Sequence, residues 1–329
     1  MKKTCIKVLK NISIVAGIVA VFAGVFNFCI YKFSFESNFG RNKKERTVEH
    51  EIEFYASEEN YNRHIADVKY IESLKLPLIE MDSFDSIRLR AILWEAKENN
   101  RGSILLMHGF HSGPLREFAT LAIFFHEMGF NVIMPYQRAH GLSDGEFLTF
   151  GIKERFDCRD WALKINELYG QDKPLFIGGI SMGCATVTMA SGLDLPLNVR
   201  GIIADCGFTE PYEITRWTAT NLMHIWPGVA DVLIASTNWY CEHAAGFELK
   251  EYSTYRALNK TDLPFLFITG TDDKTVPYEM TLTNFMLYKQ RHPDRTKLVL
   301  FEGGPHAISY LVDEDKYKAE VKKFIEKYE

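Results

Sequence analysis

The sequence predicts an α/β fold in which a mostly parallel, twisted sheet is covered by helices on both faces. Short continuous apolar runs, typical of buried parallel strands, alternate with helical segments such as residues 117–128 and 154–168. Before them, residues 77–82 and 87–94 alternate apolar and polar side chains around a polar turn, as half-buried antiparallel strands do. The apolar runs are residues 103–107, 131–134, 174–177, 199–204, 264–268 and 297–301.

The N-terminus predicts a membrane anchor within residues 1–32. Residues 11–31 contain no charged side chain and are long enough to cross a lipid bilayer as a helix. Lysines precede this run and no small-x-small cleavage signal closes it, which favours an uncleaved signal anchor over a signal peptide. Because the nearest basic residues are mostly N-terminal to the run, we expect a single-pass protein of the cell membrane whose domain is extracytoplasmic.

The rest of the chain divides into a connector and one domain. Residues 33–75 are polar and of mixed charge, which predicts a juxtamembrane connector with some helix around residues 58–70. The domain follows as residues 76–329. Residues 208–258 are inserted between two predicted strands, and their helical spacing of large apolar residues predicts a cap over the site. Trp217 and Trp226 of this insertion are therefore candidates for the substrate pocket.

Composition excludes several classes of protein. The net charge of −5 is mild and does not indicate a nucleic-acid partner. Six cysteines in 329 residues do not make a disulfide framework, and they leave Cys158 and Cys241 without an assigned role. The sequence has no metal-ligand spacing such as C-x-x-C or H-E-x-x-H, so we expect neither a metal nor a cofactor. The oligomeric state stays open.

The apolar run at residues 174–177 leads into Gly179-Ile-Ser181-Met-Gly183. This pentapeptide between a strand and a helix has the form of a nucleophile elbow, in which the serine hydroxyl points out of the sheet. Glycine suits positions 179 and 183 because side chains there would collide with neighbouring backbone in so tight a turn.

The carboxyl ends of other predicted strands supply the partners of Ser181, since chemistry in parallel sheets gathers at that edge. His108-Gly109-Phe110 follows the first run, and the N–H groups of Phe110 and Met182 are predicted to form an oxyanion hole. His108 and Gly109 are further pocket candidates, although a histidine here more often braces the loop. Tyr136, after the second run, is another candidate.

An acid and a histidine follow the last two strands. Asp272 and Asp273 lie after residues 264–268, and His306 lies after residues 297–301. The chain order of serine, aspartate and histidine matches one known arrangement of the Ser-His-Asp triad. Either aspartate satisfies this order.

From about residue 76 to its end, the sequence resembles the α/β-hydrolase superfamily, and more narrowly bacterial esterase-like or peptidase-like serine hydrolases related to cinnamoyl esterases and serine aminopeptidases. The resemblance implies the α/β-hydrolase fold. It also selects Asp273, which lies three residues after Gly270 and three before Val276-Pro277. Tyr136 departs from the aspartate common in relatives. The matching segments are residues 108–109, 138–145, 179–183, 204–205, 270–277 and His306.

These residues predict a membrane-anchored serine hydrolase that cleaves a small-molecule ester or related acyl bond. Asp273 would orient His306, and His306 would remove the proton of Ser181 as its oxygen attacks the carbonyl. The lipid bilayer is a second expected partner, through residues 11–31.

Two alternatives remain open. One is an aminopeptidase-like or acyl-peptide hydrolase, which would need an acidic group in the cap to hold an amino terminus. The other is a binding or scaffold protein whose hydrolase chemistry has lapsed, because fold alone never establishes activity. The cap carboxylates are not obviously clustered in the sequence, which favours a carboxylesterase; they are Glu210, Glu213, Asp231, Glu242 and Glu248.

Overall fold

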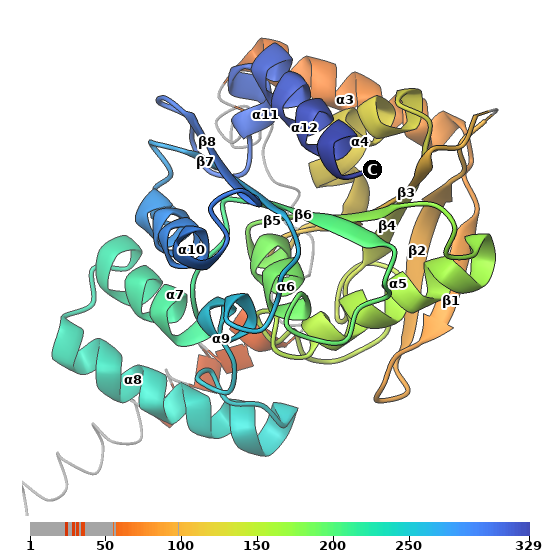
Figure 1. Ribbon diagram of the computed structural model, residues 1–329. Helices are drawn as coiled ribbons and strands as arrows, with labels where there is room; N and C mark the ends of the chain where they lie inside the picture. Colours follow the sequence, from red (N-terminus) through yellow and green to blue (C-terminus); the bar gives the residue numbers. More distant parts are fainter. Residues whose placement is uncertain are drawn as a thin grey trace, which may run out of the picture.

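A twisted sheet forms the centre of the computed structural model, which describes residues 24–25, 28–29, 31–32, 34–36, 55, 57–97 and 99–329. The sheet has eight strands in the order β1-β2-β4-β3-β5-β6-β7-β8 (Figure 1). Every apolar run of the sequence forms one of these strands. The strands are β1 (Leu78–Asp82), β2 (Arg88–Trp94), β3 (Gly102–Met107), β4 (Phe130–Tyr136), β5 (Leu175–Ile180), β6 (Val199–Asp205), β7 (Phe265–Gly270) and β8 (Thr296–Phe301).

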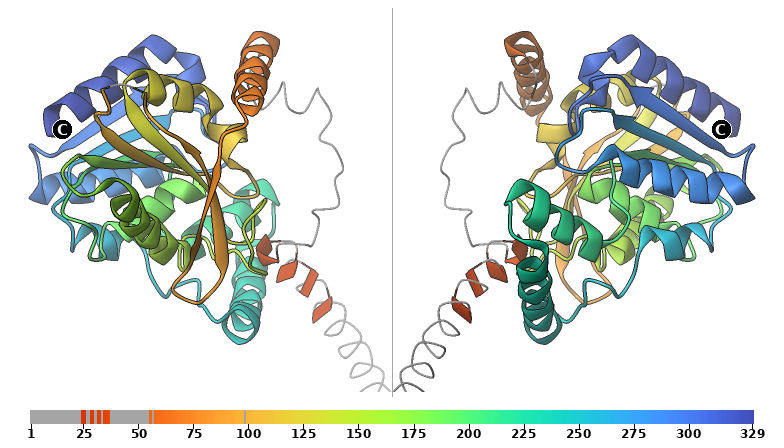
Figure 2. Two further views of the ribbon diagram at one scale, coloured as in Figure 1. Left: turned by 90° about the vertical axis from the view of Figure 1, so that its right-hand side faces the viewer. Right: turned by 90° about the vertical axis from the view of Figure 1, so that its left-hand side faces the viewer.

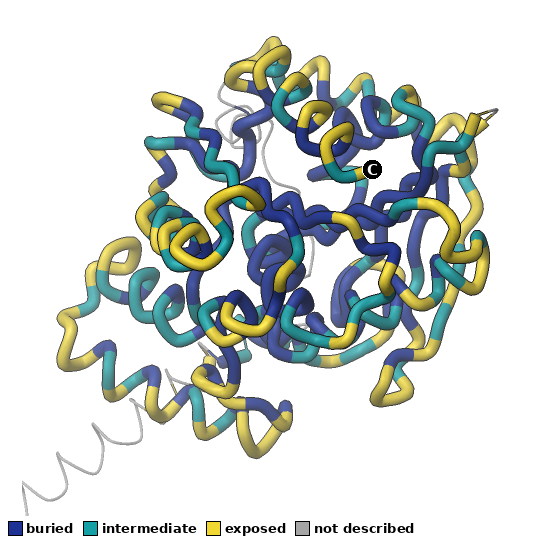
Figure 3. The backbone as a smooth tube through the Cα atoms, viewed as in Figure 1, coloured by how far each residue is buried: buried dark blue, intermediate teal, exposed yellow. Residues whose placement is uncertain are grey.

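Strand direction follows the sequence pattern. β1 pairs antiparallel with β2, and β2 pairs antiparallel with β4, whereas each remaining neighbouring pair is parallel. The parallel strands β3 to β7 are buried along nearly their whole length (Figure 3). The prediction of an α/β sheet entered through an antiparallel hairpin is confirmed.

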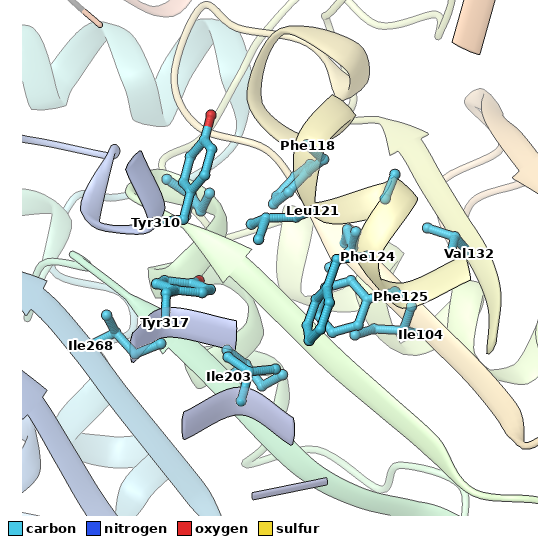
Figure 4. Packing of buried hydrophobic residues seen from close by; sticks show 14 of the residues in the cluster. Ile104, Phe118, Leu121, Phe124, Phe125, Val132, Ile203, Ile268, Tyr310 and Tyr317 are labelled. Carbon is cyan, nitrogen blue, oxygen red and sulfur yellow. The ribbon is translucent and has the colours of Figure 1, made fainter. Parts of the chain in front are cut away.

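One face of the sheet is covered by helices from both ends of the domain. Phenylalanine side chains of α4 reach towards Ile104, Val132 and Ile203 of the strands, beside Tyr310 and Tyr317 (Figure 4). Burying such aromatic and aliphatic side chains stabilises the fold by about 1.5–3 kcal/mol each. The helices of this face are α3 (Glu58–Ser73), α4 (Pro114–Glu127), α11 (Ser309–Val312) and α12 (Glu314–Tyr328).

The opposite face carries a second layer and the inserted segment. Its helices are α5 (Glu154–Tyr169), α6 (Met182–Ala190), α9 (Thr254–Leu258) and α10 (Tyr278–Arg291). Between β6 and β7, where the sequence predicts a cap, lie α7 (Pro211–Trp217), a π-helical turn η1 (Thr218–Leu222), α8 (Pro227–Tyr240) and a second π-helical turn η2 (Cys241–Ala245). In Figure 1, α7 and α8 project from one end of the domain.

Described residues that precede residue 76, where the sequence predicts a juxtamembrane connector with some helix, pack against the domain. α3 packs against α4 and buries Ile71 in the core. Tyr31 and Phe35 are 2% and 1% exposed and belong to a cluster with the cap. Figure 2 shows the described residues of this segment, in red, beside α8. Residues on the N-terminal side of the predicted boundary at residue 76 thus contribute to the buried clusters, and the boundary itself stays a prediction.

Most of the predicted anchor, residues 11–31, lies outside the described residues. Within the described part of the chain, no helix combines the length and the apolar character needed to cross a bilayer. Five cysteines are described as free thiols, and Cys158 and Cys241, which the sequence left unassigned, are both buried.

A buried ion pair at Arg138 joins the loop that follows β4 to α5 and to the turn between β1 and β2. Arg138 donates from Nε and Nη2 to both carboxylate oxygens of Asp157 at 2.7 Å, and their side chains are 2% and 1% exposed. The same guanidinium binds Asp85, in the turn between β1 and β2, at 2.9 and 3.1 Å. The arginine therefore has a structural role, joining the three segments.

We predict that Arg138→Met lowers the free energy of unfolding by about 3–5 kcal/mol, because it leaves the buried Asp157 carboxylate without its counter-ion. Arg159→Met is the matched control: it removes a more exposed pair with Asp160 and should cost less than about 1 kcal/mol. Urea unfolding measures both variants. Equal losses would contradict the structural role of Arg138.

Candidate active site

Ser181 lies in the turn between β5 and α6, with φ 56° and ψ −119°. A positive φ is strained for a residue with a side chain and costs about 1–3 kcal/mol, so it persists only where surrounding structure enforces it. The Ser181 N–H donates to the carbonyl of Asp205 at the end of β6, at 3.0 Å. This geometry is that of the predicted nucleophile elbow.

Close backbone contacts leave no room for a side chain at either glycine of the pentapeptide. A Cβ built on Gly183 would lie 1.8 Å from the carbonyl oxygen of Met107, at the end of β3. A Cβ on Gly179 would lie 2.3 Å from the carbonyl oxygen of Gly183. Both contacts are with backbone, which cannot move aside as a flexible side chain would. The start of α6 is therefore held flush against the neighbouring strand.

The structure brings together the serine, histidine and aspartate that the sequence predicts. His306 Nε2 lies 2.9 Å from Ser181 Oγ, and His306 Nδ1 lies 2.6 Å from Asp273 Oδ2. The other Asp273 oxygen accepts the N–H groups of Thr275 and Val276 at 2.9 Å each. With Nδ1–H donating to the carboxylate, the imidazole presents Nε2 to the serine hydroxyl as an acceptor.

The structure also decides between the two aspartates. The Asp273 side chain is fully buried against His306. The Asp272 side chain is 56% exposed and faces Lys274 at 3.4 Å. Asp273 is therefore the residue that can orient the imidazole.

Three carboxylates surround His306. Burial by itself would lower the pKa of His306, but the charge and hydrogen bond of Asp273, with the charges of Glu117 and Asp205, outweigh it and raise this pKa above its ordinary value. Burial raises the pKa of Glu117 to about 7 and that of Asp205 to about 7. The imidazolium form is thus stabilised by groups that are themselves costly to ionise.

The predicted oxyanion donors lie beside the serine. Met182 is the first residue of α6, where backbone N–H groups have no acceptor within the helix. Phe110 belongs to the loop after β3, and both residues line one cavity with Ser181. Glu117 Oε2 accepts the N–H of Gly109 at 2.7 Å and holds this loop from below. Two backbone donors can therefore face the space above the serine.

The cavity beside Ser181 has a volume of about 510 Å³ and is almost entirely apolar. Among the residues that the structure describes, none of its lining side chains is charged. The lining comes from the N-terminal segment (Cys29, Ser34, Phe35), the loops around the elbow (Phe110, Phe150, Ser181, Met182, Phe208, Thr275, Val276) and the cap (Ile214, Thr215, Thr218, Ala219, Leu222, Met223, Ile225, Leu233, Ile234, Thr237). A pocket of this size and character suits a small apolar ligand.

The five predicted pocket residues lie outside this lining. His108 is fully buried and braces the loop, because its Nε2 accepts the N–H of Gln137 at 3.1 Å. Gly109 does not line the cavity although it is close to Ser181: a Cβ built on it would lie 3.2 Å from the serine Cβ. Tyr136 packs its ring across the loop that follows β4.

The two predicted tryptophans are also absent from the cavity lining. Trp217 packs against the apolar cluster of the cap, and Trp226 is 76% exposed at the start of α8. Both were selected for their size and apolar character, which predict a contact surface without specifying which side of a helix faces the cavity.

Sequence reasoning missed two kinds of residue at this site. Glu117 lies in the first turn of the helix that follows the His108-Gly109 loop, a position that could have identified it. Cys29, Ser34 and Phe35 were assigned to an anchor and a connector, so no sequence signal linked them to the cavity.

One group of described residues offers metal-ligand atoms near the serine. Atoms of Cys206, Asp273 and His306 lie within 4.8 Å of one another. The aspartate and imidazole atoms are already hydrogen-bonded to each other. Burial also raises the pKa of the Cys206 thiol well above its ordinary value, and a neutral thiol is a poor metal ligand. The group suits proton transfer better than metal binding.

Comparison with known proteins gives both a family match and a fold match. The family model described as the prolyl oligopeptidase family matches residues 149–329, more than half of the chain. The uncharacterised protein YqkD of Bacillus subtilis is 25% identical over 233 residues, which cover 70% of this chain and 73% of that protein. The uncharacterised membrane protein YNL320W of Saccharomyces cerevisiae is 24% identical over 249 residues, which cover 75% of this chain and 78% of the yeast protein. The structure of the Pyrococcus furiosus esterase Pf2001 matches with a TM-score of 0.62 and 19% identity, over 78% of this chain and 95% of the esterase. The fold is therefore that of the α/β hydrolases.

We predict that Gly183→Ala destabilises the protein by about 3 kcal/mol or more, because its methyl group would overlap the Met107 carbonyl. Gly228→Ala is the control, since a Cβ there meets its nearest atoms at 3.6 Å and its φ is unremarkable for any residue. Thermal unfolding should show a lower Tm for the first variant alone. A Gly183→Ala protein as stable as its parent would refute the tight contact.

Proposed function

The chain belongs to the prolyl oligopeptidase family of α/β-hydrolase serine hydrolases, and we propose that it is membrane-anchored and cleaves carboxylic esters of apolar acyl groups. One observation carries this proposal. The hydrogen-bonded line of Ser181, His306 and Asp273 opens into a cavity without charged lining among the described residues.

The geometry supports an acyl-enzyme mechanism. His306 Nε2 takes the proton of Ser181 Oγ as this oxygen attacks the ester carbonyl, and Asp273 stabilises the imidazolium that forms. The N–H groups of Phe110 and Met182 bind the developing oxyanion. The imidazolium then protonates the departing alcohol, and a water molecule repeats the same steps on the acyl-enzyme to release the acid.

The cavity favours an ester over a peptide with a free amino terminus. An amino terminus needs a carboxylate partner in so apolar a space, and no described carboxylate lines the cavity. In the cap, Asp231 pairs with Arg216, and Glu213 binds Tyr255. Peptide cleavage is the second candidate, because the matched family is named for oligopeptidases.

Anchoring in a membrane is supported by the uncharged residues 11–31. Val25 and Phe28, which belong to that run and are described, are 57% and 43% exposed. The yeast relative is also named as a membrane protein. The proposal places the domain outside the cytoplasm, as the distribution of basic residues in the sequence favours.

We predict that Ser181→Ala loses hydrolysis of p-nitrophenyl butyrate by several orders of magnitude and loses labelling by a fluorophosphonate probe, because no nucleophile remains. Ser73→Ala is the control, since its hydroxyl lies on the exposed end of α3. A panel of p-nitrophenyl esters and aminoacyl p-nitroanilides separates esterase from peptidase activity. Equal labelling of the parent and Ser181→Ala would refute the nucleophile, and an unlabelled parent would indicate a lapsed enzyme.

We predict that kcat/KM rises with pH through a midpoint above the ordinary histidine value of 6.5, because His306 must be neutral to act as base and its pKa is raised. Asp273→Asn removes the negative charge that raises this pKa. The midpoint should therefore move to lower pH, while kcat falls by about 10⁴.

The matched control for the pH profile is Asp272→Asn, because this neighbouring carboxylate is exposed and does not contact His306. It should leave both the midpoint and kcat unchanged. An Asp273→Asn profile that superimposes on that of the parent would show that another group supplies the base.

A further inference from the structure

The cap exposes several large apolar side chains at the end of η1 and along α8. Trp226 and Val232 are 76% and 69% exposed. Residues 217–230 contain no aspartate, glutamate, lysine or arginine. Exposed apolar patches of this kind mark interaction surfaces. We call the patch the cap face; it comprises Leu222, Met223, Trp226, Val229, Val232 and Trp239.

Helical spacing gives α8 two apolar sides. Ala230, Ile234 and Thr237 recur at helical intervals and are buried within the cap. Val229, Val232 and Trp239 recur on a different side of the helix and are exposed. A surface helix normally has one apolar stripe, which faces the core. The second, exposed stripe of α8 therefore indicates contact with another apolar surface.

The uncharged N-terminal run reaches this same helix. The ring of Phe28 lies 5.7 Å from that of Tyr240, and the ring of Tyr31 stacks on Tyr240 at 5.4 Å. Phe28 and Val25 are themselves exposed. The end of residues 11–31 and the end of α8 are therefore side by side.

The cavity reaches the surface beside the N-terminal segment and η1. Cys29, Leu222 and Met223 each line the cavity and are each exposed at the surface. At its inner end, the same cavity is lined by Ser181. An apolar path thus leads from the cap face and the N-terminal segment to the nucleophile.

We propose that the cap face lies in the surface of the lipid bilayer, and that an ester of an apolar acyl chain passes from the bilayer through this entrance to Ser181. A bilayer is the expected partner of the cap face because the uncharged residues 11–31 end beside α8. Trp226 and Trp239 suit this position because tryptophan prefers the boundary between lipid and water. The route of the substrate rests on the proposed esterase function.

The first experiment compares a soluble substrate with a bilayer substrate, using the full-length chain. The double variant Val229→Asp with Val232→Asp places two charges on the cap face, outside the cavity lining. It should hydrolyse p-nitrophenyl acetate at the rate of the parent. Hydrolysis of p-nitrophenyl palmitate carried in phosphatidylcholine vesicles should fall by about tenfold or more, because charges oppose insertion into lipid.

The matched control is Leu163→Asp with Leu168→Asp. These leucines are also exposed, at 46% and 43%, but lie on α5, away from the cap (Figure 1). This variant should hydrolyse both substrates as the parent does. A parent inactive on the soluble ester would refute the proposed function. Equal hydrolysis of the vesicle substrate by the parent and the cap variant would refute the route from the bilayer.

The second experiment tests the lipid contact without catalysis. Brominated phosphatidylcholine vesicles should quench part of the tryptophan fluorescence of the full-length chain, and Trp226→Phe combined with Trp239→Phe should remove most of the quenched part. Trp94→Phe, a change at a buried residue, should leave the quenched part of the fluorescence unchanged. Quenching unaffected by the double variant would overturn the proposal. The absence of any quenching, as expected if a second copy of the chain covered the cap face, would overturn it as well.

Discussion

The contact between the start of α6 and the end of β3 is the constraint on which the site depends. A Cβ on Gly183 would lie 1.8 Å from the Met107 carbonyl, so only glycine permits this approach. The approach brings the loop after β3 beside the strained turn of Ser181. Phe110 and Met182, from two separate elements, consequently line the same space as the nucleophile. The elbow therefore positions the two predicted oxyanion donors as well as the serine.

Buried carboxylates act on His306 electrostatically. Asp273 holds His306 by a direct hydrogen bond, whereas Glu117 and Asp205 act through their charge. Glu117 and Asp205 also accept hydrogen bonds from neighbouring elements. Glu117 binds the loop that carries Phe110, and Asp205 accepts a hydrogen bond from Tyr317 at 3.1 Å. Their charge is costly to bury, so burial raises the pKa of each carboxyl to about 7.

Described residues of the N-terminal segment form part of the cavity beside Ser181. An anchor that served only as a tether would leave the cavity complete without it. Here Ser34 and Phe35 form part of the cavity wall, and Phe35 is almost fully buried. Tyr31 stacks on the cap helix beside them. The described N-terminal residues, the cap and the wall of the cavity are thus held together by one packed cluster.

The sequence by itself determined the strands, the elbow at Ser181 and the positions of its partners, because parallel strand ends meet at one edge and local patterns identify each end. It left Asp272 and Asp273 equivalent until the resemblance selected one of them, and burial then separated the two. Only the tertiary structure decided the cavity wall. Hydrophobicity predicts that Trp226 and Phe35 seek apolar surroundings, but it does not say which surroundings. Packing turned the tryptophan outward and brought the residue assigned to a connector into the site.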